Sequence, residues 1–142
     1  MADTEQYVRK LETMTSIFKQ ITRPQIGVFG EKHLDGYNFS LGWSLLTEPL
    51  LMVDETHNHD FDQLILFFGG DPNNIGELDG EVEIYLGDNQ EKHVITSPAS
   101  VFIPRGLMHC PLNIKTVNKP FMFIDITFSP GTSVRPIPEV TK

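Results

Sequence analysis

The chain has 142 residues, of which 39% are hydrophobic and 21% charged, and its formal net charge is −8. This length and composition predict one globular domain with its own core, and the acidic charge argues against nucleic acid and anionic membranes as partners, because both require a basic surface. The single cysteine, the lack of a signal-peptide core and the lack of an apolar run of about 18 residues favour a cytoplasmic protein without a membrane span.

Residues 5–21 are predicted to form an amphipathic helix that precedes the main domain. Hydrophobic side chains recur there every three or four positions, at Val8, Leu11, Met14, Phe18 and Ile21. Arg23 and Pro24 follow, and a proline at this point ends a helix. The expected organisation is an N-terminal helical segment, 1–24, and a β domain, 25–142. The helix either covers a sheet or contacts a second subunit.

The hydrophobic period changes to two from Tyr37 onward, which is typical of strands. One face of the first strand is apolar and is expected to face the interior: Phe39, Leu41, Trp43 and Leu45. Further strands are predicted at 63–68, 81–86, 93–96, 101–103 and 121–128. In the strand at 81–86, Val82, Ile84 and Leu86 are expected to face inward and Glu81 and Glu83 outward. Many short strands separated by turn residues indicate a β-sandwich or barrel. The proline-containing segment after Ser129 is expected to run extended over the surface.

The strand at 63–68 is hydrophobic on both faces, whereas a sheet with one face in water alternates apolar and polar residues. Its outward residues would be Leu64, Leu66 and Phe68. We expect the N-terminal segment or a second subunit to cover them, because large exposed apolar patches usually mark interfaces. The sequence therefore predicts a symmetric homodimer.

Two short stretches about fifty residues apart contain residue types that bind metal ions. The first carries His57, His59 and Gln63, and the second carries His109. Alternate side chains of an extended strand share a face, so the first three should point the same way. A histidine from a distant strand can then complete a cluster of three imidazoles. Such a cluster suits zinc, copper, iron or nickel and leaves coordination positions open for catalysis.

These stretches resemble the two sequence motifs of the cupin superfamily. The positions that agree are His57, His59, Pro104, Gly106, His109 and Asn113. Three positions differ, because Leu51 and Pro98 replace the leading glycines and Gln63 replaces the usual glutamate. The resemblance implies an all-β cupin fold, a double-stranded β-helix or jelly-roll barrel, with a divalent metal held inside by the three histidines. It also implies iron(II) as the favoured metal, with zinc, nickel and manganese as alternatives.

Gln63 and Arg105 are the candidate catalytic residues. If the amide oxygen of Gln63 binds the metal, it adds no charge and leaves a more electrophilic dication; otherwise Gln63 hydrogen-bonds a bound water. Arg105 lies between Pro104 and Gly106 of the second stretch. Its guanidinium binds either a substrate carboxylate at the pocket mouth or a surface acid. Pro104 and Gly106 are expected to shape the turn that presents the following histidine.

Residues with the strand parity of the histidines are expected either to line an apolar pocket beside the metal or to form plain core. They are Phe61, Ile65 and Phe67, with Phe39, Leu41 and Trp43 from another strand. Cys110 directly follows His109 and should therefore face away from the metal, as a buried thiol. Asn113 has the parity of His109, and a backbone hydrogen bond is its expected role.

The predicted function is that of a small-molecule metalloenzyme, in particular an iron-dependent dioxygenase acting on a small carbonyl, thiol or aromatic compound. The Lewis acidity of the metal could instead drive an isomerase or lyase reaction. A non-catalytic metabolite-binding module is the other class of function that the motifs allow. The sequence does not separate these functions, because fold alone is no guide to chemistry.

Overall fold

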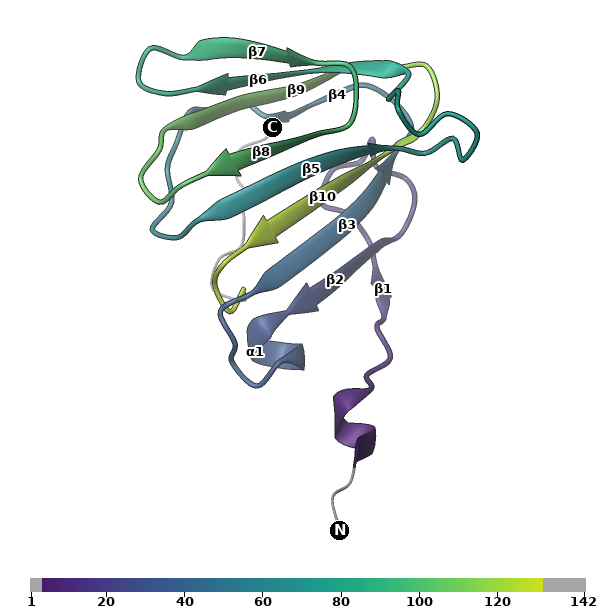
Figure 1. Ribbon diagram of the computed structural model, residues 1–142, viewed down its shortest axis with the longest axis vertical. Coiled ribbons are helices and arrows are strands. Elements are labelled where there is room, and N and C mark those ends of the chain that lie inside the picture. Colours follow the sequence, from purple (N-terminus) through teal and green to yellow (C-terminus); the bar gives the residue numbers. More distant parts are fainter. Residues whose placement is uncertain (1–3, 132–142) are drawn as a thin grey trace.

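Two antiparallel sheets face each other in the computed structural model, which describes residues 4–131 (Figure 1). The larger sheet has the strand order β1-β2-β3-β10-β5-β8, and the smaller has the order β4-β9-β6-β7. The strands are β1 (Thr13–Met14), β2 (Gln25–Phe29), β3 (Ser40–Leu46), β4 (Leu50–Val53), β5 (Gln63–Gly69), β6 (Gly80–Leu86), β7 (Glu91–Ile95), β8 (Ala99–Ile103), β9 (His109–Val117) and β10 (Phe121–Thr127). This arrangement confirms the predicted all-β jelly roll.

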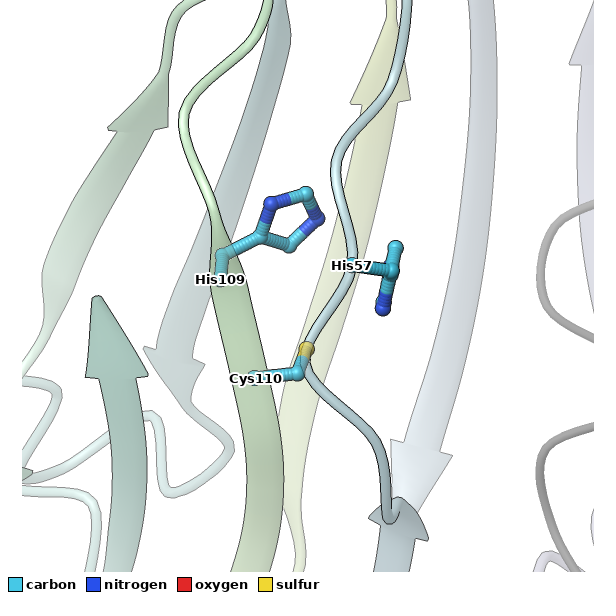
Figure 2. A group of neighbouring side chains, drawn as sticks. All are labelled: His57, His109 and Cys110. Carbon is cyan, nitrogen blue, oxygen red and sulfur yellow. The ribbon is translucent and has the colours of Figure 1, made fainter. Parts of the chain in front are cut away.

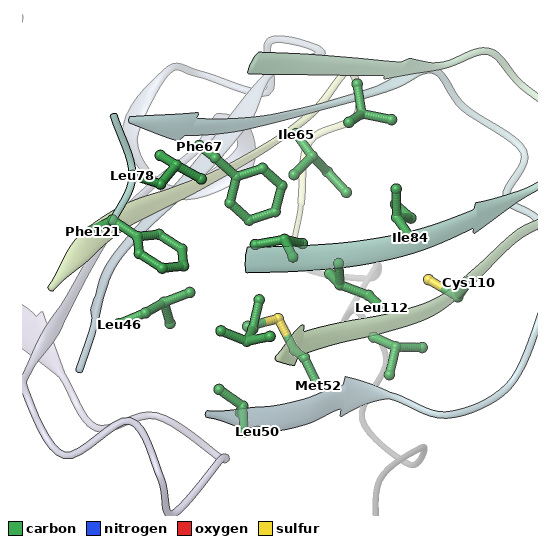
Figure 3. Packing of buried hydrophobic residues seen from close by; sticks show 14 of the residues in the cluster. Leu46, Leu50, Met52, Ile65, Phe67, Leu78, Ile84, Cys110, Leu112 and Phe121 are labelled. Carbon is green, nitrogen blue, oxygen red and sulfur yellow. The ribbon is translucent and has the colours of Figure 1, made fainter. Parts of the chain in front are cut away.

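The hydrophobic core lies between the two sheets (Figure 3). Phe67 of β5 and Phe121 of β10 are completely buried and meet edge to face with their ring centroids 6.4 Å apart. Val82 and Ile84 of β6 oppose them from the smaller sheet and are also completely buried. Glu83, between those two, faces outward and lies 3.4 Å from the ammonium group of Lys115. The alternation predicted for this strand is therefore confirmed.

The predicted helix over residues 5–21 is wrong. Within the described part of the chain the only helices are a short 3-10 helix at Thr4–Tyr7 and the four-residue α1 (Gly30–His33), and neither could span a membrane. β1 instead pairs with the edge of β2, with Thr13 opposite Ile26. The exposed backbone groups of a sheet edge offer hydrogen bonds, and Thr13, Thr15 and Ser16 are weak helix formers. Strand pairing with the edge of β2 is therefore favoured over the helix that the amphipathic pattern predicted.

The expected surface tail includes residues 132–142, which lie outside the described part of the chain.

The inward face of β3 is also the opposite of the one predicted. The register with β10 places Ser44 opposite Phe123 and Gly42 opposite Asp125, all facing the smaller sheet. The apolar residues therefore point outward: Leu41, Trp43 and Leu45. Ser44 is buried without penalty because its hydroxyl oxygen accepts a 2.6 Å hydrogen bond from the side-chain amide of Gln25. The small inward residues of β3 leave space inside the barrel.

The outer face of the larger sheet consequently forms a broad apolar surface. Three residues come from each of three adjacent central strands, with further ones toward the edges: Leu41, Trp43 and Leu45, Met122, Ile124 and Ile126, Leu64, Leu66 and Phe68, then Ile26, Val28 and Phe102. Phe68 and Phe102 are 41% and 56% exposed. The smaller sheet differs, because its outer face carries ion pairs such as Lys92–Glu83 and Lys115–Glu81.

We predict that this apolar surface is the contact of a homodimer. Light scattering should give twice the chain mass of 16.1 kDa. Replacing both Leu66 and Phe68 by aspartate should yield monomers or insoluble protein, because charge would be buried at the contact. Val94→Asp is the matched control, since Val94 is 51% exposed on β7 of the other sheet. A monomer at micromolar concentration for the unaltered chain would contradict the prediction.

Candidate metal centre

Reciprocal backbone hydrogen bonds bring the two histidine-containing stretches together. The N–H of His57 donates to the carbonyl of His109 at 3.0 Å, and the N–H of His109 donates to the carbonyl of His57 at 2.8 Å. The two residues therefore form an antiparallel pair beyond the end of β4, in continuation of its pairing with β9. Directly opposed residues of such a pair project to the same side. Both imidazoles consequently lie on one face.

A tight turn before β9 fixes the third histidine. Gly106 has a φ of 86°, a conformation that favours glycine, and the turn closes when the N–H of Leu107 donates to the carbonyl of Pro104 at 3.0 Å. Glycine at the third position is what a type II turn requires. The N–H of Gly106 then donates to the carbonyl of His59 at 3.0 Å. The structural roles predicted for Pro104 and Gly106 are thus confirmed.

Three imidazole rings lie within one cluster. The ring centroids of His57 and His109 are 4.3 Å apart, those of His57 and His59 are 4.8 Å apart, and those of His59 and His109 are 5.1 Å apart. The ring of His59 also stacks on Phe61, with a centroid distance of 4.7 Å and an interplanar angle of 12°. The geometry therefore brings the three predicted rings together, while the group of potential donor atoms that lie within 4.8 Å of one another contains His57, His109 and Cys110 and does not include His59.

Backbone carbonyls select which ring nitrogen is available. Nδ1 of His109 lies 2.8 Å from the carbonyl oxygen of Leu107, and Nδ1 of His57 lies 3.0 Å from that of Glu55. A carbonyl oxygen can only accept, so Nδ1 carries the proton in both rings and Nε2 keeps its lone pair. Such hydrogen bonds orient histidine ligands in metal sites.

Nε2 of His109 is the observation that fits a metal best. This atom is buried and has no hydrogen-bond partner, in a residue that is only 2% exposed. A buried polar atom without a partner is costly and rare in native proteins. A cation bound between the three rings would satisfy it. The chemistry of the donor set therefore fits a metal that prefers imidazole nitrogen.

Cys110 does not face away from the cluster, contrary to the parity argument. The register of β9 against β6 shifts here, because Ile84 pairs with Leu112 whereas Leu86 pairs with His109. An advance of two residues along β6 thus corresponds to an advance of three residues along β9, so β9 contains a β-bulge. Within this bulge Cys110 has a φ of 82°. The bulge turns both His109 and Cys110 inward. Sγ of Cys110 and one ring nitrogen each of His57 and His109 all lie within 4.8 Å of one another (Figure 2).

The same bulge reverses the expected direction of Asn113. Leu112 and Ile114 are buried on the inner face of β9, at 2% and 0% exposure. Asn113 lies between them and faces outward, where its amide donates to Glu83 at 3.5 Å. Its parity with His109 is therefore wrong. The hydrogen bond that it makes runs to a side chain rather than to the backbone.

Gln63 and Asp125 form a hydrogen-bonded pair inside the barrel. The side-chain amide nitrogen of Gln63 donates to Oδ1 of Asp125 at 2.8 Å. Because a carboxylate only accepts, this contact fixes the amide orientation and leaves Oε1 of Gln63 as the free end. That oxygen is buried and has no partner. The sequence offered a signal for Asp125 that was missed, since it is a charged residue within the apolar strand 121–127.

A cavity of about 260 Å³ adjoins the cluster. It touches all three histidines, Gln63 and Asp125, together with Phe61 and Ile65, for which the sequence left pocket lining and plain core open; Ile65 also belongs to the core. Phe67 belongs instead to the core. Leu41 and Trp43 border the cavity along β3, whose register turns their side chains outward. On the opposite side, residues 14–18 of the N-terminal segment complete the lining. The pocket thus combines apolar walls with polar groups beside the cluster.

Arg105 lies away from the cavity. Its side chain is 69% exposed, and its guanidinium is 3.6 Å from the carboxylate of Asp60. Its backbone N–H donates to the carboxylate of Asp62 at 2.8 Å, which secures the turn. Asp60 and Asp62 are both exposed, and neither lines the cavity. The catalytic role of Arg105 stays a prediction that this geometry does not favour.

Burial controls the protonation of the cluster. Burial, followed by the neighbouring His109 and His57 rings, lowers the pKa of His59 from 6.5 to about 4. Burial is also the main cause that lowers the pKa of His109. Neutral imidazoles are the form that binds a metal. Burial and the charge of Asp125 raise the pKa of Cys110 from 9.0 to about 12, so its thiol is a poor nucleophile near neutrality.

Known proteins resemble this chain in fold and not in sequence. No protein-family model matches it, and no curated protein matches it. The structure of FeII HppE matches with a TM-score of 0.53 at 9% identity, over 84% of this chain and 57% of that one. Peruvianin-I, a cysteine peptidase from Thevetia peruviana latex, matches with a TM-score of 0.56 at 15% identity, over 92% of this chain and 78% of that one. Oxalate decarboxylase from Bacillus subtilis gives a TM-score of 0.46 at 11% identity, over 76% of this chain and 26% of that one.

The chain shares the fold of HppE, an all-β jelly roll as the resemblance to the cupin motifs implied. It spans 57% of HppE and about a quarter of oxalate decarboxylase. At such low identity the likeness concerns the fold alone. The roles of individual residues rest on the geometry described above.

Acid should destabilise the metal-free protein through His59. The unfolded chain binds a proton at this residue below its ordinary pKa of 6.5, whereas the folded protein does so only near pH 4. The free energy of unfolding should therefore fall as the pH drops from 6.5 to 4. Urea unfolding of the metal-free protein should show this decline. His59→Gln should reduce the slope of the unfolding free energy against pH without abolishing it, because the pKa of His109 is lowered as well.

The matched control is His93→Gln at an exposed position on β7, which should leave the slope of the unfolding free energy against pH unchanged. Equal slopes in all three proteins would contradict the assignment.

Proposed function

We propose that the chain is a metal-dependent enzyme in which His57, His59 and His109 hold one divalent cation and the adjoining cavity binds a small substrate. The observation that carries this proposal is the buried Nε2 of His109, which lacks a hydrogen-bond partner in a ring whose centroid lies 4.3 Å from that of His57 and 5.1 Å from that of His59. Iron(II) is the favoured metal, because imidazole ligands suit it and because HppE, which shares the fold, was solved in its FeII form.

An oxygenase acting on a small carbonyl, thiol or aromatic compound is the reaction class that we favour. Bound iron(II) would supply the means to chelate such a substrate and to react with dioxygen. The chain itself contributes a cavity whose apolar walls, among them Phe61 and Ile65, exclude water from the reacting groups. A metal-dependent isomerase or lyase is the alternative, since it needs the same Lewis acid and the same cavity.

Gln63 and Asp125 would position polar groups of the substrate. Oε1 of Gln63 is held in place by the contact of the amide nitrogen with Asp125 and can accept one hydrogen bond from a hydroxyl or a bound water. In the alternative role, the same oxygen binds the metal directly. Both roles require the orientation that Asp125 imposes, so Asp125 is a positioning residue in this proposal.

Cysteine-dependent hydrolysis is not the function that this site supports. Peruvianin-I, which shares the fold, is described as a cysteine peptidase. In this chain burial raises the pKa of the Cys110 thiol to about 12, whereas a nucleophilic cysteine needs a lowered pKa.

Removal of a histidine should remove the metal. Each of His57→Ala, His59→Ala and His109→Ala should lower the bound metal measured by elemental analysis, because three imidazoles hold the ion. His93→Ala is the matched control and should keep full occupancy, since His93 lies exposed on β7. The iron-loaded protein should then consume dioxygen with at least one member of a diketone, thiol and catechol panel. Full occupancy in the His109→Ala protein would refute the site, and metal binding without turnover would favour a metabolite-binding module.

Gln63→Glu should make the protein depend more strongly on its metal. The substitution removes the donor to Asp125 and places two carboxylates 2.8 Å apart, which destabilises the ionised pair in the metal-free protein. A bound cation offsets this repulsion. Metal should therefore raise the Tm of Gln63→Glu more than that of the unaltered chain, and the added charge should lower the redox potential of bound iron. An equal rise in Tm for both proteins would mean that the side chain at position 63 has no electrostatic interaction with the metal.

A further inference from the structure

We propose that Sγ of Cys110 is a fourth protein ligand of the metal. The inference rests on the proposed metal site and extends it from a set of imidazoles to a mixed nitrogen and sulfur set. Its geometric basis is the β-bulge, which presents Cys110 and His109 on the same side of β9 although they are adjacent in sequence. Figure 2 shows both side chains beside His57.

The positions of the donor atoms support coordination. Sγ of Cys110 and the ring nitrogens of His57 and His109 lie within 4.8 Å of one another. Bonds of about 2.0 Å to nitrogen and about 2.3 Å to sulfur would bring adjacent ligand atoms about 3.3–3.5 Å apart in a tetrahedral shell and about 2.8–3.0 Å apart in an octahedral shell. The side chains must therefore rotate toward one another when the metal binds. The buried Nε2 of His109, which has no partner, independently indicates a cation at this point.

The charge of the site also favours a thiolate. Three imidazoles and the amide of Gln63 are neutral ligands, so none of them offsets the charge of a dication, and the carboxylate of Asp125 lines the same cavity but is hydrogen-bonded to Gln63. Buried charges in proteins are normally paired. As the bond between Sγ and the metal forms, the thiol proton passes to solvent and the resulting thiolate cancels one positive charge. Cys110 would thus supply the charge that the neutral Gln63 does not.

A sulfur ligand narrows the class of metal. Thiolate and imidazole together suit iron, zinc, cobalt and copper, and they disfavour magnesium, calcium and manganese, which prefer oxygen. Four protein ligands still leave two positions open on an octahedral iron(II) ion, which is enough for a substrate that chelates. They would fill a tetrahedral zinc ion completely. The native metal is therefore expected to be six-coordinate.

X-ray absorption of the full chain loaded with one equivalent of zinc under reducing conditions tests this ligand directly. The unaltered protein should show one sulfur scatterer at about 2.3 Å beside the nitrogen shell. Cys110→Ser should lose the sulfur shell and keep the nitrogen shell, with zinc bound at least about 10-fold more weakly, a loss that even outer-shell partners can cause. Met52→Leu is the matched control, because the Met52 thioether lines the same cavity, and this variant should keep the sulfur shell.

The outcomes separate this proposal from the metal site itself. A shell of nitrogen and oxygen alone in the zinc-loaded, unaltered protein would overturn the role of Cys110 and leave the histidine site standing. A sulfur shell that persists in Cys110→Ser would assign the sulfur to a methionine and would also overturn it. Failure of the unaltered chain to bind zinc or cobalt would refute both. If Cys110→Ser does not fold, a thiolate-to-cobalt charge-transfer band in the unaltered protein and in Met52→Leu supports the proposal, and its absence overturns it.

Discussion

The backbone pair between His57 and His109 is the interaction on which the rest of the site depends. Two hydrogen bonds, 3.0 and 2.8 Å long, join residues that are far apart in sequence and extend the pairing of β4 with β9 past an irregular stretch. They align two rings, and the turn at Gly106 adds the third by holding the carbonyl of His59. Without this pair the three imidazoles would lie on two separate segments, the loop after β4 and the start of β9, and the loss of conformational entropy on metal binding would be larger.

Much of the fold could be predicted from periodicity, because a strand with one buried face repeats every two residues. The strand at 81–86 was placed correctly, with Val82 and Ile84 inward, since its other face is charged. The same rule gave the wrong inner face for β3. Both faces of the larger sheet carry apolar residues, and the apolar Leu41 and Trp43 lie on the outer face whereas Ser44 lies inside. Hydrophobicity alone does not identify the interior when a sheet has two apolar sides.

The histidines of the candidate site were predictable because their spacing fits an extended strand and a known pair of motifs. Cys110 and Asp125 were not found, for different reasons. A parity argument assumes a regular strand, and the bulge at Cys110 adds one residue that shifts every later side chain, Asn113 included, to the other face. Asp125 belongs to a strand that carries no motif, and only the pairing of β10 with β5 shows that it meets Gln63.

The open space beside Gly42 determines how large a molecule the cavity can hold. A methyl group added at Gly42 would meet no atom within 4 Å, so the position borders open space inside the barrel. Gly42 lies on β3, whereas the three imidazoles belong to the segments around β4 and β9. A larger side chain there would shorten the room for a ligand without displacing a donor atom. In the proposed enzyme, reactivity and size discrimination would therefore be encoded on different strands, and a single substitution would alter which molecules fit while the metal ligands stay the same.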